Sequence, residues 1–532
     1  MTGVTGTGLL VRLGLRRDRR QLLVWVLALG LLSIYTVVAL DRLYPTAADR
    51  AARAAVVDTP AGIIFSGPGF GTDAYTLGAM TANEMGLTIM IAMAIMSILL
   101  VVRHTRAEEE DGRAELLLAG SIGRQAPLTT AVALMMLADV AVATLIGLGL
   151  IGTGLEVVDS LVFVAGLALT GMVFGGVAAV TAQLFEHGRA ASGAALAVLG
   201  VTAVARGIGD MLEDGGSWLS WLSPIAWAQQ TRPFVELRWW PLLLSVALIA
   251  GLVELGFVLN GRRDFAAGAV APRRGPARAS AWLTAPGMLF ARLQRGTVIG
   301  WAVALLVLGG TFGSLAREAA SMIADNPAIA AAFGGAEGSF VDAFLSVSAL
   351  YLAFGSAAFA VASVLRLRAE ETSGRAELLL AHPLDRRRFL GSGLLVTGLA
   401  TLLLLLVGGL GGGLAAAASL GDGAYVWSGV TAALAHAPAV LVIAGLAAML
   451  VGLVPQWSML AWLVLAWSLI TGMFGPLLDL PEWALKLGPF GWDPAVPAEE
   501  AAAAPLIGLV LTAAVLVSIA LAGFRGRDVP AS

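Results

Sequence analysis

Residues 85–124 read MGLTIMIAMAIMSILLVVRHTRAEEEDGRAELLLAGSIGR, and this stretch decides the class of fold. Its first part, residues 85–102, carries no charge and has about the twenty residues that a helix needs to cross a bilayer. Its second part is rich in Ala, Glu, Arg and Leu, which favour helix. The stretch therefore predicts a membrane-spanning helix that leads directly into a charged segment.

The whole chain has the composition of a membrane protein. Of its 532 residues, 58% are hydrophobic and only 13% are charged, against about 25% charged residues in an ordinary soluble domain. A soluble fold of this composition would expose large apolar patches. The apolar runs are too long and too continuous for the alternating strands of a membrane barrel. We therefore predict an all-α membrane protein, because a helix satisfies its own backbone hydrogen bonds in lipid.

Twelve apolar runs are long enough to be spans, and they fall into two groups of six. A Pro-, Gly- and Arg-rich cytoplasmic linker, residues 261–285, separates a first six-helix half at 1–260 from a second at 286–532. The predicted spans are 22–40, 85–102, 126–153, 160–184, 190–210 and 240–259, followed by 298–315, 342–365, 391–417, 427–453, 457–478 and 505–523.

The basic residues are distributed unevenly between alternate loops. With the N-terminus placed inside the cell, 25 of the 33 Lys and Arg residues fall in cytoplasmic segments. Basic loops favour the cytoplasmic side of a membrane. We therefore predict a multi-pass protein of the plasma membrane, with both termini and the loops after spans 2 and 8 in the cytoplasm.

An internal repeat is the strongest signal in the sequence. RAEEEDGRAELLLAGSIGR (106–124) aligns without gaps with RAEETSGRAELLLAHPLDR (368–386), and 13 of the 19 residues are identical. A weaker echo, the dipeptide Arg-Asp, follows the last span of each half at 263–264 and 527–528. Because six spans per half bring both halves into the membrane from the same side, we expect a pseudo-twofold axis along the membrane normal.

Each copy of the repeated motif is expected to be helical. Glu109 and Arg113 have the spacing of a favourable i,i+4 ion pair, and Glu371 and Arg375 repeat it. One interpretation is an interfacial helix that only anchors a loop. Two nearly identical copies favour docking on a partner instead, because anchoring constrains hydrophobicity and not the identity of charged residues.

Several kinds of chemistry have no residues to support them. The chain has no cysteine and four scattered histidines, so no metal site is predicted. Lys486 is the only lysine, and it does not stand in the G-x-x-x-x-G-K-[ST] sequence that a P-loop ATPase needs. We therefore expect no cofactor, no ATPase site and no enzymatic activity in this chain itself.

The features together resemble the permeases of ABC-2 type exporters. The resemblance rests on six spans per half with R-x-E-E-x-x-G-x-x-E-x-L-L between the second and third. It implies that each motif is a coupling helix, at about 107–120 and 369–382, docked on a nucleotide-binding subunit. Residues 189–244 are similar to the actinobacterial, tetronasin-type exporters of polyketide antibiotics, and the similarity covers nearly the whole chain. In that group the ATPase is a separate polypeptide.

The resemblance assigns docking on the ATPase to seven residues in each copy of the motif. Residues 372–373 are Thr-Ser where 110–111 are Glu-Asp, which leaves open whether the two copies dock equally. The assigned residues are Arg106, Glu108, Glu109, Gly112, Arg113, Glu115, Leu116, Arg368, Glu370, Glu371, Gly374, Arg375, Glu377 and Leu378.

Polar residues within the spans are candidates for a translocation path. Asp139, Glu254 and His436 lie in apolar runs, and such residues usually face protein or water. They are expected to line the path, to accept a proton or to pin helices together. Two Gly- and Phe-rich external loops and a Trp cluster suggest an exit gate, with an aromatic belt at the membrane boundary as the other interpretation. The gate candidates are Phe65, Phe70, Trp218, Trp221, Phe333 and Phe340.

These observations predict an exporter permease for hydrophobic drugs or polyketide-type antibiotics. Its expected partners are two copies of a separate ABC ATPase, which would bind ATP and Mg, together with the lipid bilayer and a hydrophobic small molecule, but no nucleic acid. Two alternatives stay open: a proton-coupled secondary drug transporter that uses Asp139 and Glu254, and an ABC-2 permease for lipid or another cargo.

Overall fold

The computed structural model describes residues 3–118, 120–270, 277–278, 280, 283, 285–317, 320, 337–381, 384–474, 481–499 and 502–527. Every regular element within these residues is a helix, and eleven helices are long and apolar enough to cross a membrane. The predicted all-α membrane fold is therefore confirmed. The chain divides into two compact units, Met1–Gly275 and Pro276–Ser532.

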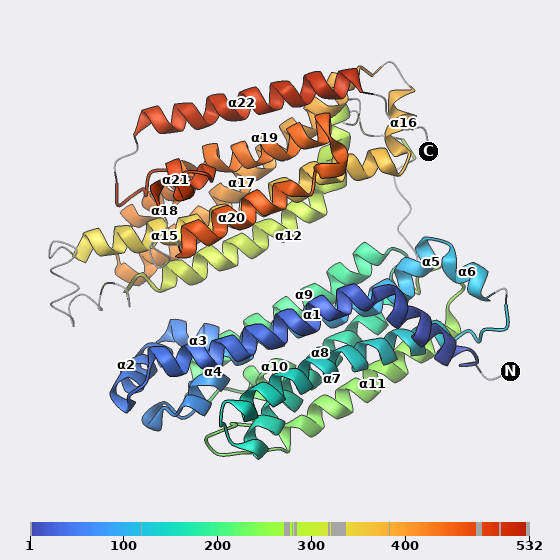
Figure 1. Cartoon of the computed structure of the whole chain (residues 1–532), viewed down its shortest axis with the longest axis vertical. Helices are drawn as coiled ribbons and strands as arrows, with labels where there is room; N and C mark the ends of the chain where they lie inside the picture. The colour runs from blue at the N-terminus through green and yellow to red at the C-terminus, as the bar shows by residue number, and fades with distance from the viewer. Residues whose placement is uncertain are drawn as a thin grey trace. The chain divides into compact units, whose positions relative to one another are not determined.

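The first unit contains six candidate spans and several short helices. The spans are α1 (Thr7–Leu43), α4 (Leu77–Val102), α7 (Ala126–Gly152), α8 (Val157–Leu184), α9 (Gly188–Leu212) and α11 (Pro241–Arg262). The short helices are α2 (Ala47–Val57), α3 (Pro60–Ser66), α5 (Glu108–Glu110), α6 (Arg113–Leu118) and α10 (Pro224–Gln229). Figure 1 shows α5 and α6 at the same end of the unit as the start of α1, and we call this the motif end.

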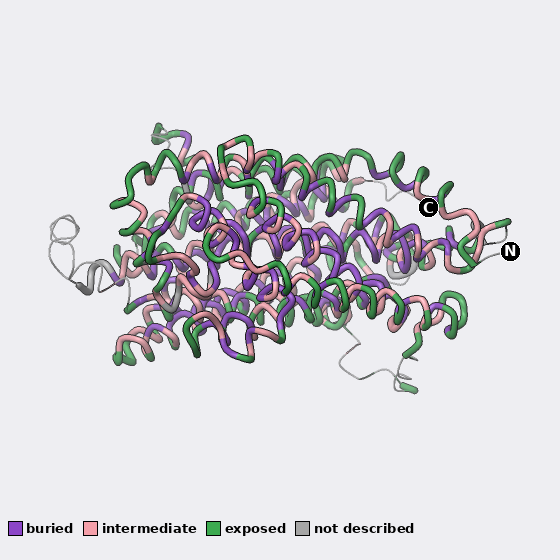
Figure 2. The backbone as a smooth tube through the Cα atoms, turned by 90° about the horizontal axis from the view of Figure 1, so that it is seen from below, coloured by how far each residue is buried: buried purple, intermediate pink, exposed green. Residues whose placement is uncertain are grey.

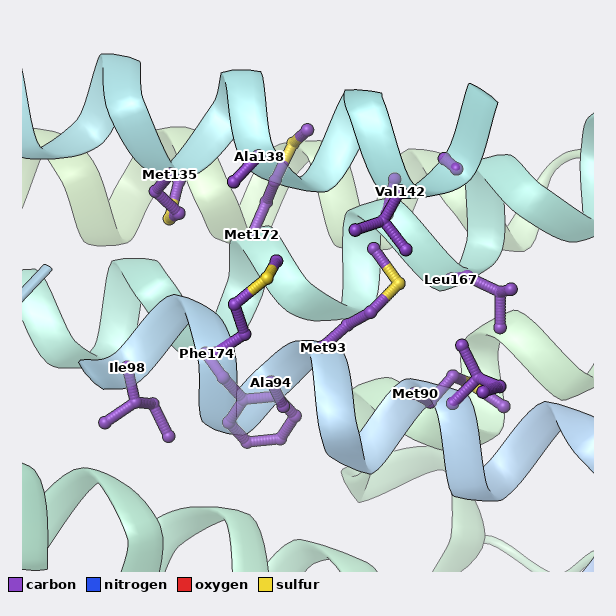
Figure 3. Packing of buried hydrophobic residues seen from close by; sticks show 14 of the residues in the cluster. Met90, Met93, Ala94, Ile98, Met135, Ala138, Val142, Leu167, Met172 and Phe174 are labelled. Atoms are coloured by element: carbon purple, nitrogen blue, oxygen red, sulfur yellow. The ribbon is translucent and has the colours of Figure 1, made fainter. Parts of the chain in front are cut away.

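Methionines fill the centre of the first unit. Met90 and Met93 of α4, Met135 of α7 and Met172 of α8 are buried and pack together around Phe174 (Figure 3). The unbranched, polarizable Met side chain fills irregular gaps between helices. The core therefore joins α4, α7 and α8. The motif lies between α4 and α7 in the chain, and the end of α8 lies beside it.

The outer faces of the helices stay apolar. On α7, Leu137, Val140 and Leu148 are exposed, whereas Leu134 and Val142 are buried. Most helices likewise contain both buried and exposed positions, as Figure 2 shows. Exposed apolar side chains on long helices are what a lipid-facing surface requires, because lipid offers no polar partner.

The described part of the second unit contains five candidate spans and three shorter α-helices. The candidate spans are α12 (Pro286–Ser314), α15 (Glu337–Thr372), α17 (Arg386–Leu420), α18 (Ala424–Ala435) continued by α19 (Ala437–Leu453), and α22 (Ala503–Gly526). The remaining helices are α16 (Arg375–Leu380), α20 (Leu460–Phe474) and α21 (Glu482–Leu485). The predicted span 457–478 corresponds to α20, which begins at Leu460 after a turn at Pro455–Trp457, and the described residues there end at Phe474.

Glycines bring two helices of the second unit into backbone contact. Gly309 and Gly313 of α12 face Gly408 and Gly412 of α17, and a methyl group on either α12 glycine would meet a carbonyl oxygen of α17. Small residues four apart allow helices in lipid to approach this closely. The repeated Gly in LVGGLGGGL (406–414) therefore marks a packing surface.

The two units pack their long helices in the same pairwise pattern. In the first unit α1 packs along α7, and both α4 and α11 pack on α8. In the second unit α12 packs along α17, and both α15 and α22 pack on α19. Corresponding helices therefore make corresponding contacts, so the repeat extends beyond the motif. The pseudo-twofold axis between the halves stays a prediction.

Candidate functional site

Each copy of the motif folds as a helix, a glycine turn and a second short helix. In the first unit α5 ends at Glu110, Gly112 has a φ of 72°, and α6 begins at Arg113. In the second unit α15 ends at Thr372, and Gly374 has a φ of 73°. Positive φ is readily adopted only by glycine. The two glycines therefore divide the segments 107–120 and 369–382, predicted as coupling helices, into two helical parts each.

The first glutamate of each motif pairs with the arginine beyond the turn. Glu108 Oε2 lies 2.8 Å from Arg113 Nε, and Glu370 Oε2 lies 2.5 Å from Arg375 Nε. These hydrogen bonds to carboxylates raise the pKa of both arginines. The predicted i,i+4 pairs within the motif are wrong, because the glycine turn interrupts helical spacing and presents the arginine to the earlier glutamate.

The second glutamate of each motif turns toward the last helix of its unit. Glu109 pairs with Arg106 Nη1 at 2.9 Å and with Arg263, which follows α11. Glu371 Oε2 lies 2.5 Å from Arg527 Nη2, which follows α22. The repeated Arg of the Arg-Asp dipeptide is thus the partner of the repeated glutamate.

Arg106 is one of the most buried side chains in the chain. Its Nε and Nη2 donate to the carbonyl oxygen of Ala182, at 2.9 and 2.7 Å, and its remaining donors reach Glu109 and the carbonyls of Ala266 and Ala267. Arg368 has a smaller set of described contacts, with Nη1 donating to Ser458 Oγ at 2.5 Å. Arg106 is therefore not available to a partner protein, whereas Arg368 is partly exposed.

The first residues of the linker are packed, not solvated. Arg263 is buried and its Nε donates to Gln183 Oε1 at 2.7 Å. The backbone N–H of Ala269 donates to the Gln183 carbonyl at 2.9 Å, and that of Val270 to the Leu184 carbonyl at 3.1 Å. Residues 263–270, the first part of the predicted linker, therefore fold back on the end of α8.

The outer face of each motif remains open. Glu115 in the first unit and Glu377 in the second are exposed, and neither side chain has a hydrogen bond or ion pair to a described residue. Arg113 and Arg375 are also more than half exposed. Leu116 lies in α6 and Leu378 in α16, with side chains outside the described set. The predicted docking residues whose side chains are described thus divide into an inner set that holds the motif and an outer set that faces away.

The candidate path residues are in three different environments. Asp139 on α7 is fully buried, and both carboxylate oxygens lie 2.9 Å from Ser97 Oγ of α4. Glu254 is on the exposed face of α11, without a hydrogen bond or ion pair to any described residue. His436, between α18 and α19, has Nδ1 2.9 Å from Asp493 Oδ2. The hydrogen bonds of the described residues do not connect these positions into a relay.

The predicted gate residues whose side chains are described make separate contacts. Arg232 lies over the ring of Phe70 at 4.4 Å, and both line a small pocket of the first unit. Trp221 stacks on Trp240 at 5.5 Å, whereas Trp218 is 71% exposed. Exposed indole rings are typical of a membrane boundary. The side chains outside the described set are those of Phe65, Phe333 and Phe340.

Arg206 and Asp210 form a buried ion pair on α9 that the sequence analysis did not single out. Their side chains lie 3.3 Å apart, and Asp210 Oδ1 accepts a 2.5 Å hydrogen bond from Ser220 Oγ. Arg206 also donates to the carbonyls of Ile63 and Ile64, at the end of α3. The i,i+4 spacing of opposite charges in a predicted span was the available signal. The pair therefore holds α3 and the segment at Ser220 against α9, and both of these lie close in sequence to predicted gate residues.

An apolar groove of about 450 Å³ runs between three helices of the second unit. Phe312 of α12, Tyr351 and Phe354 of α15 and Trp462 of α20 line it. Phe354 also packs on Phe490, with ring centroids 4.8 Å apart. The groove is thus aromatic, and the motif-bearing helix α15 forms one of its walls.

Eleven candidate spans in two units, each with its own folded copy of one motif, define a multi-pass membrane protein built from two related halves. A family model described as "Multidrug efflux system permease Rv1217c, C-terminal domain" matches residues 9–259 and 283–525. The chain therefore belongs to this permease family. It is 38% identical over 535 residues to the multidrug efflux system permease protein Rv1217c of Mycobacterium tuberculosis (strain ATCC 25618 / H37Rv), covering 99% of this chain and 96% of that protein. The gap between the two matched ranges falls in the linker.

Proposed function

We propose that the chain is the membrane permease of an ATP-driven ABC exporter, powered by two copies of a separate ATPase subunit that bind ATP and Mg. Its cargo would be hydrophobic drugs, with polyketide-type antibiotics as the specific class that the sequence resemblance suggests. The orientation that fits this role places both motifs and both termini in the cytoplasm.

One observation carries the proposal: the two motifs have the same local structure. Each has a helix, a glycine with φ near 70° and a second helix. In each, an inner glutamate is bound within the unit, while Glu115 or Glu377 stays exposed. Two copies of one surface fit two copies of one partner. Charged residues on such a surface set register and specificity.

Drug export is supported by the relative and by the groove. The Mycobacterium tuberculosis protein is described as a multidrug efflux permease, and the groove of the second unit is lined by Phe312, Tyr351, Phe354 and Trp462. Ligand sites for hydrophobic molecules are concave and mostly apolar and aromatic. We infer that the groove accepts part of a hydrophobic drug when ATP hydrolysis moves the motifs.

The test is a double charge reversal on the exposed face of the motifs. Glu115→Arg with Glu377→Arg should reduce both co-purification of the ATPase and ethidium efflux from cells, with the melting temperature unchanged. The matched control, Arg262→Glu with Arg525→Glu, reverses two exposed charges outside the motif and should retain both. Undiminished efflux in the Glu115 and Glu377 variant would contradict docking at this face.

The energy source separates the proposal from a proton-coupled transporter. Efflux by the wild-type chain should stop with orthovanadate and continue when an ionophore collapses the proton gradient. The opposite result would favour the secondary transporter. Export of lipid in place of ethidium would instead favour the other alternative, an ABC-2 permease for lipid or another cargo.

A further inference from the structure

The last helix of each unit ends in an arginine with the same backbone conformation. Arg263 caps α11 with φ −84° and ψ 153°, and Arg527 caps α22 with φ −94° and ψ 152°. The side chain of each donates to the second glutamate of the motif in its own unit, Glu109 or Glu371. We call each arginine–glutamate pair a latch.

The backbone of each latch arginine is bound as well. The carbonyl oxygen of Arg263 accepts a hydrogen bond from Arg124, just before α7, and that of Arg527 accepts one from Arg386 Nη1 at 2.7 Å, the first residue of α17. Carbonyls at the end of a helix lack partners within the helix. In both units, therefore, one residue joins the motif, the start of the third span and the end of the last span.

The latches are mostly buried. The side chains of Arg263 and Glu109 are 4% and 12% exposed, and those of Arg527 and Glu371 are 16% and 5% exposed. Burying an ion pair is a weak source of stability, because desolvation offsets the attraction, whereas removing one partner leaves a buried charge. A buried pair that recurs with the same residue types in both units is better explained by positioning than by stability.

We propose that the two latches are the links through which a displaced motif moves the last span of its half. The inference rests on the proposed function, since a bound ATPase is what would displace the motif. The ATPase binds the outer face of the motif and displaces it. The inner glutamate moves with the motif, and its ion pair with the arginine displaces the end of α11 or α22. Arg263 and Arg527 are thus positioning residues for transport.

The first experiment measures the link in the permease alone. Because the chain has no cysteine, Glu377→Cys and Arg525→Cys place two nitroxide labels on exposed positions of α16 and α22. The distance distribution between the labels should be narrow and should broaden when Arg527→Ala is added. An unchanged width would overturn the latch, whether or not an ATPase drives the protein.

The second experiment measures coupling in vesicles that contain the chain and its co-purified ATPase, with ethidium as the transported probe. Arg527→Ala should lower the ethidium transported per ATP hydrolysed by roughly tenfold, because Glu371 loses its buried partner. Arg525→Ala, two residues away and exposed, should keep the wild-type ratio. The reversed pair Glu371→Arg with Arg527→Glu should recover part of the loss.

A merely structural role gives a different result. A destabilised permease would lose hydrolysis and transport in the same proportion, and that outcome overturns the proposal. If Arg527→Ala does not accumulate as folded protein, Arg527→Lys keeps the charge but not the forked donor and gives the same readout. Wild-type vesicles that transport ethidium without ATP would contradict the proposed function, and the distance measurement would still decide the latch.

Discussion

Arg17 Nη1 of α1 lies 2.7 Å from Glu108 Oε1, so the first helix is tied directly to the motif of the first unit. Beside this pair, Asp18 of α1 contacts His104 and Arg103, each at 2.6 Å. Among the described residues of the second unit, α12 forms no ion pair with its motif. The two motifs therefore share their local fold but differ in how firmly the first span holds them.

This difference predicts unequal effects of the same substitution in the two halves. Glu108→Ala removes the partner of Arg17 and Arg113 and should lower the free energy of unfolding by about 1–3 kcal/mol, the range for hydrogen bonds to charged groups. Glu370→Ala removes only the exposed Arg375 pair and should cost about 0–1 kcal/mol. Chemical unfolding in detergent measures both, and equal losses would contradict the asymmetry.

Asp139 is predicted to act in packing. Among the described residues, Ser97 is the one hydrogen-bond donor to its two carboxylate oxygens, and no basic side chain forms an ion pair with it. An amide has the same shape and needs no counter-ion, so Asp139→Asn should leave the free energy of unfolding within about 1 kcal/mol of wild type or raise it, because an unpaired buried charge is costly.

The same variant tests the proton-coupled alternative. Ethidium efflux by Asp139→Asn should stay within a few-fold of wild type, since packing does not require a titratable group. Gly171→Ala is the structural control, because its methyl group would lie 2.6 Å from Asp139 Oδ1 and should destabilise the unit. Complete loss of efflux in a well-folded Asp139→Asn protein would favour the relay.

Asp493 gives a pH-dependent prediction. Burial raises the pKa of this carboxyl, and the neighbouring His436 offsets part of the increase. The folded chain therefore keeps the proton at pH values where the unfolded chain, with a pKa of about 3.9, has lost it. The stability from this group is complete below the unfolded pKa and falls as pH rises toward the folded pKa.

Replacing Asp493 with asparagine removes that loss. The melting temperature of Asp493→Asn minus that of wild type should increase as pH rises from about 4 toward neutrality. Asp214→Asn, an exposed acid in the other unit, should show a small and constant difference. A pH-independent difference for Asp493→Asn would show that its carboxyl is not destabilised in the folded chain.

The sequence predicted the spans and the duplicated motif because apolar length and residue identity are local signals. It mispaired Glu109 with Arg113, because spacing along a helix does not register that Gly112 adopts a positive φ. The correct partner, Arg263, lies 154 residues away. Its repetition after the last span was visible, but nothing in the spacing linked that arginine to the motif.

Other site residues had weaker signals. Arg206 binds the carbonyls of Ile63 and Ile64, and backbone acceptors have no sequence signature. Asp493 became notable only because folding of the loop after α21 brings it to His436. Partners of this kind are chosen by tertiary packing, so single residues could be nominated from the sequence while their contacts could not.

The contact between α12 and α17 predicts opposite behaviour for two adjacent glycines. A methyl group at Gly309 would meet the carbonyl oxygen of Gly408, whereas one at Gly310 would have its nearest neighbour, the Gly411 carbonyl oxygen, at 3.9 Å. Alanine favours helix over glycine by about 1 kcal/mol, and both substitutions gain this term. Gly309→Ala must also separate two backbones, at a cost of about 1–3 kcal/mol or more for overpacking.

The net result should therefore differ in sign. Gly310→Ala should leave the melting temperature in detergent unchanged or raise it, and Gly309→Ala should lower it. No rotamer change relieves the clash at Gly309, because the opposing atom belongs to the backbone and α17 as a whole must move. Equal melting temperatures for the two variants would show that the helices are not in backbone contact there. A drop confined to Gly309→Ala would identify glycine, and not apolar bulk, as the residue that holds these two spans together.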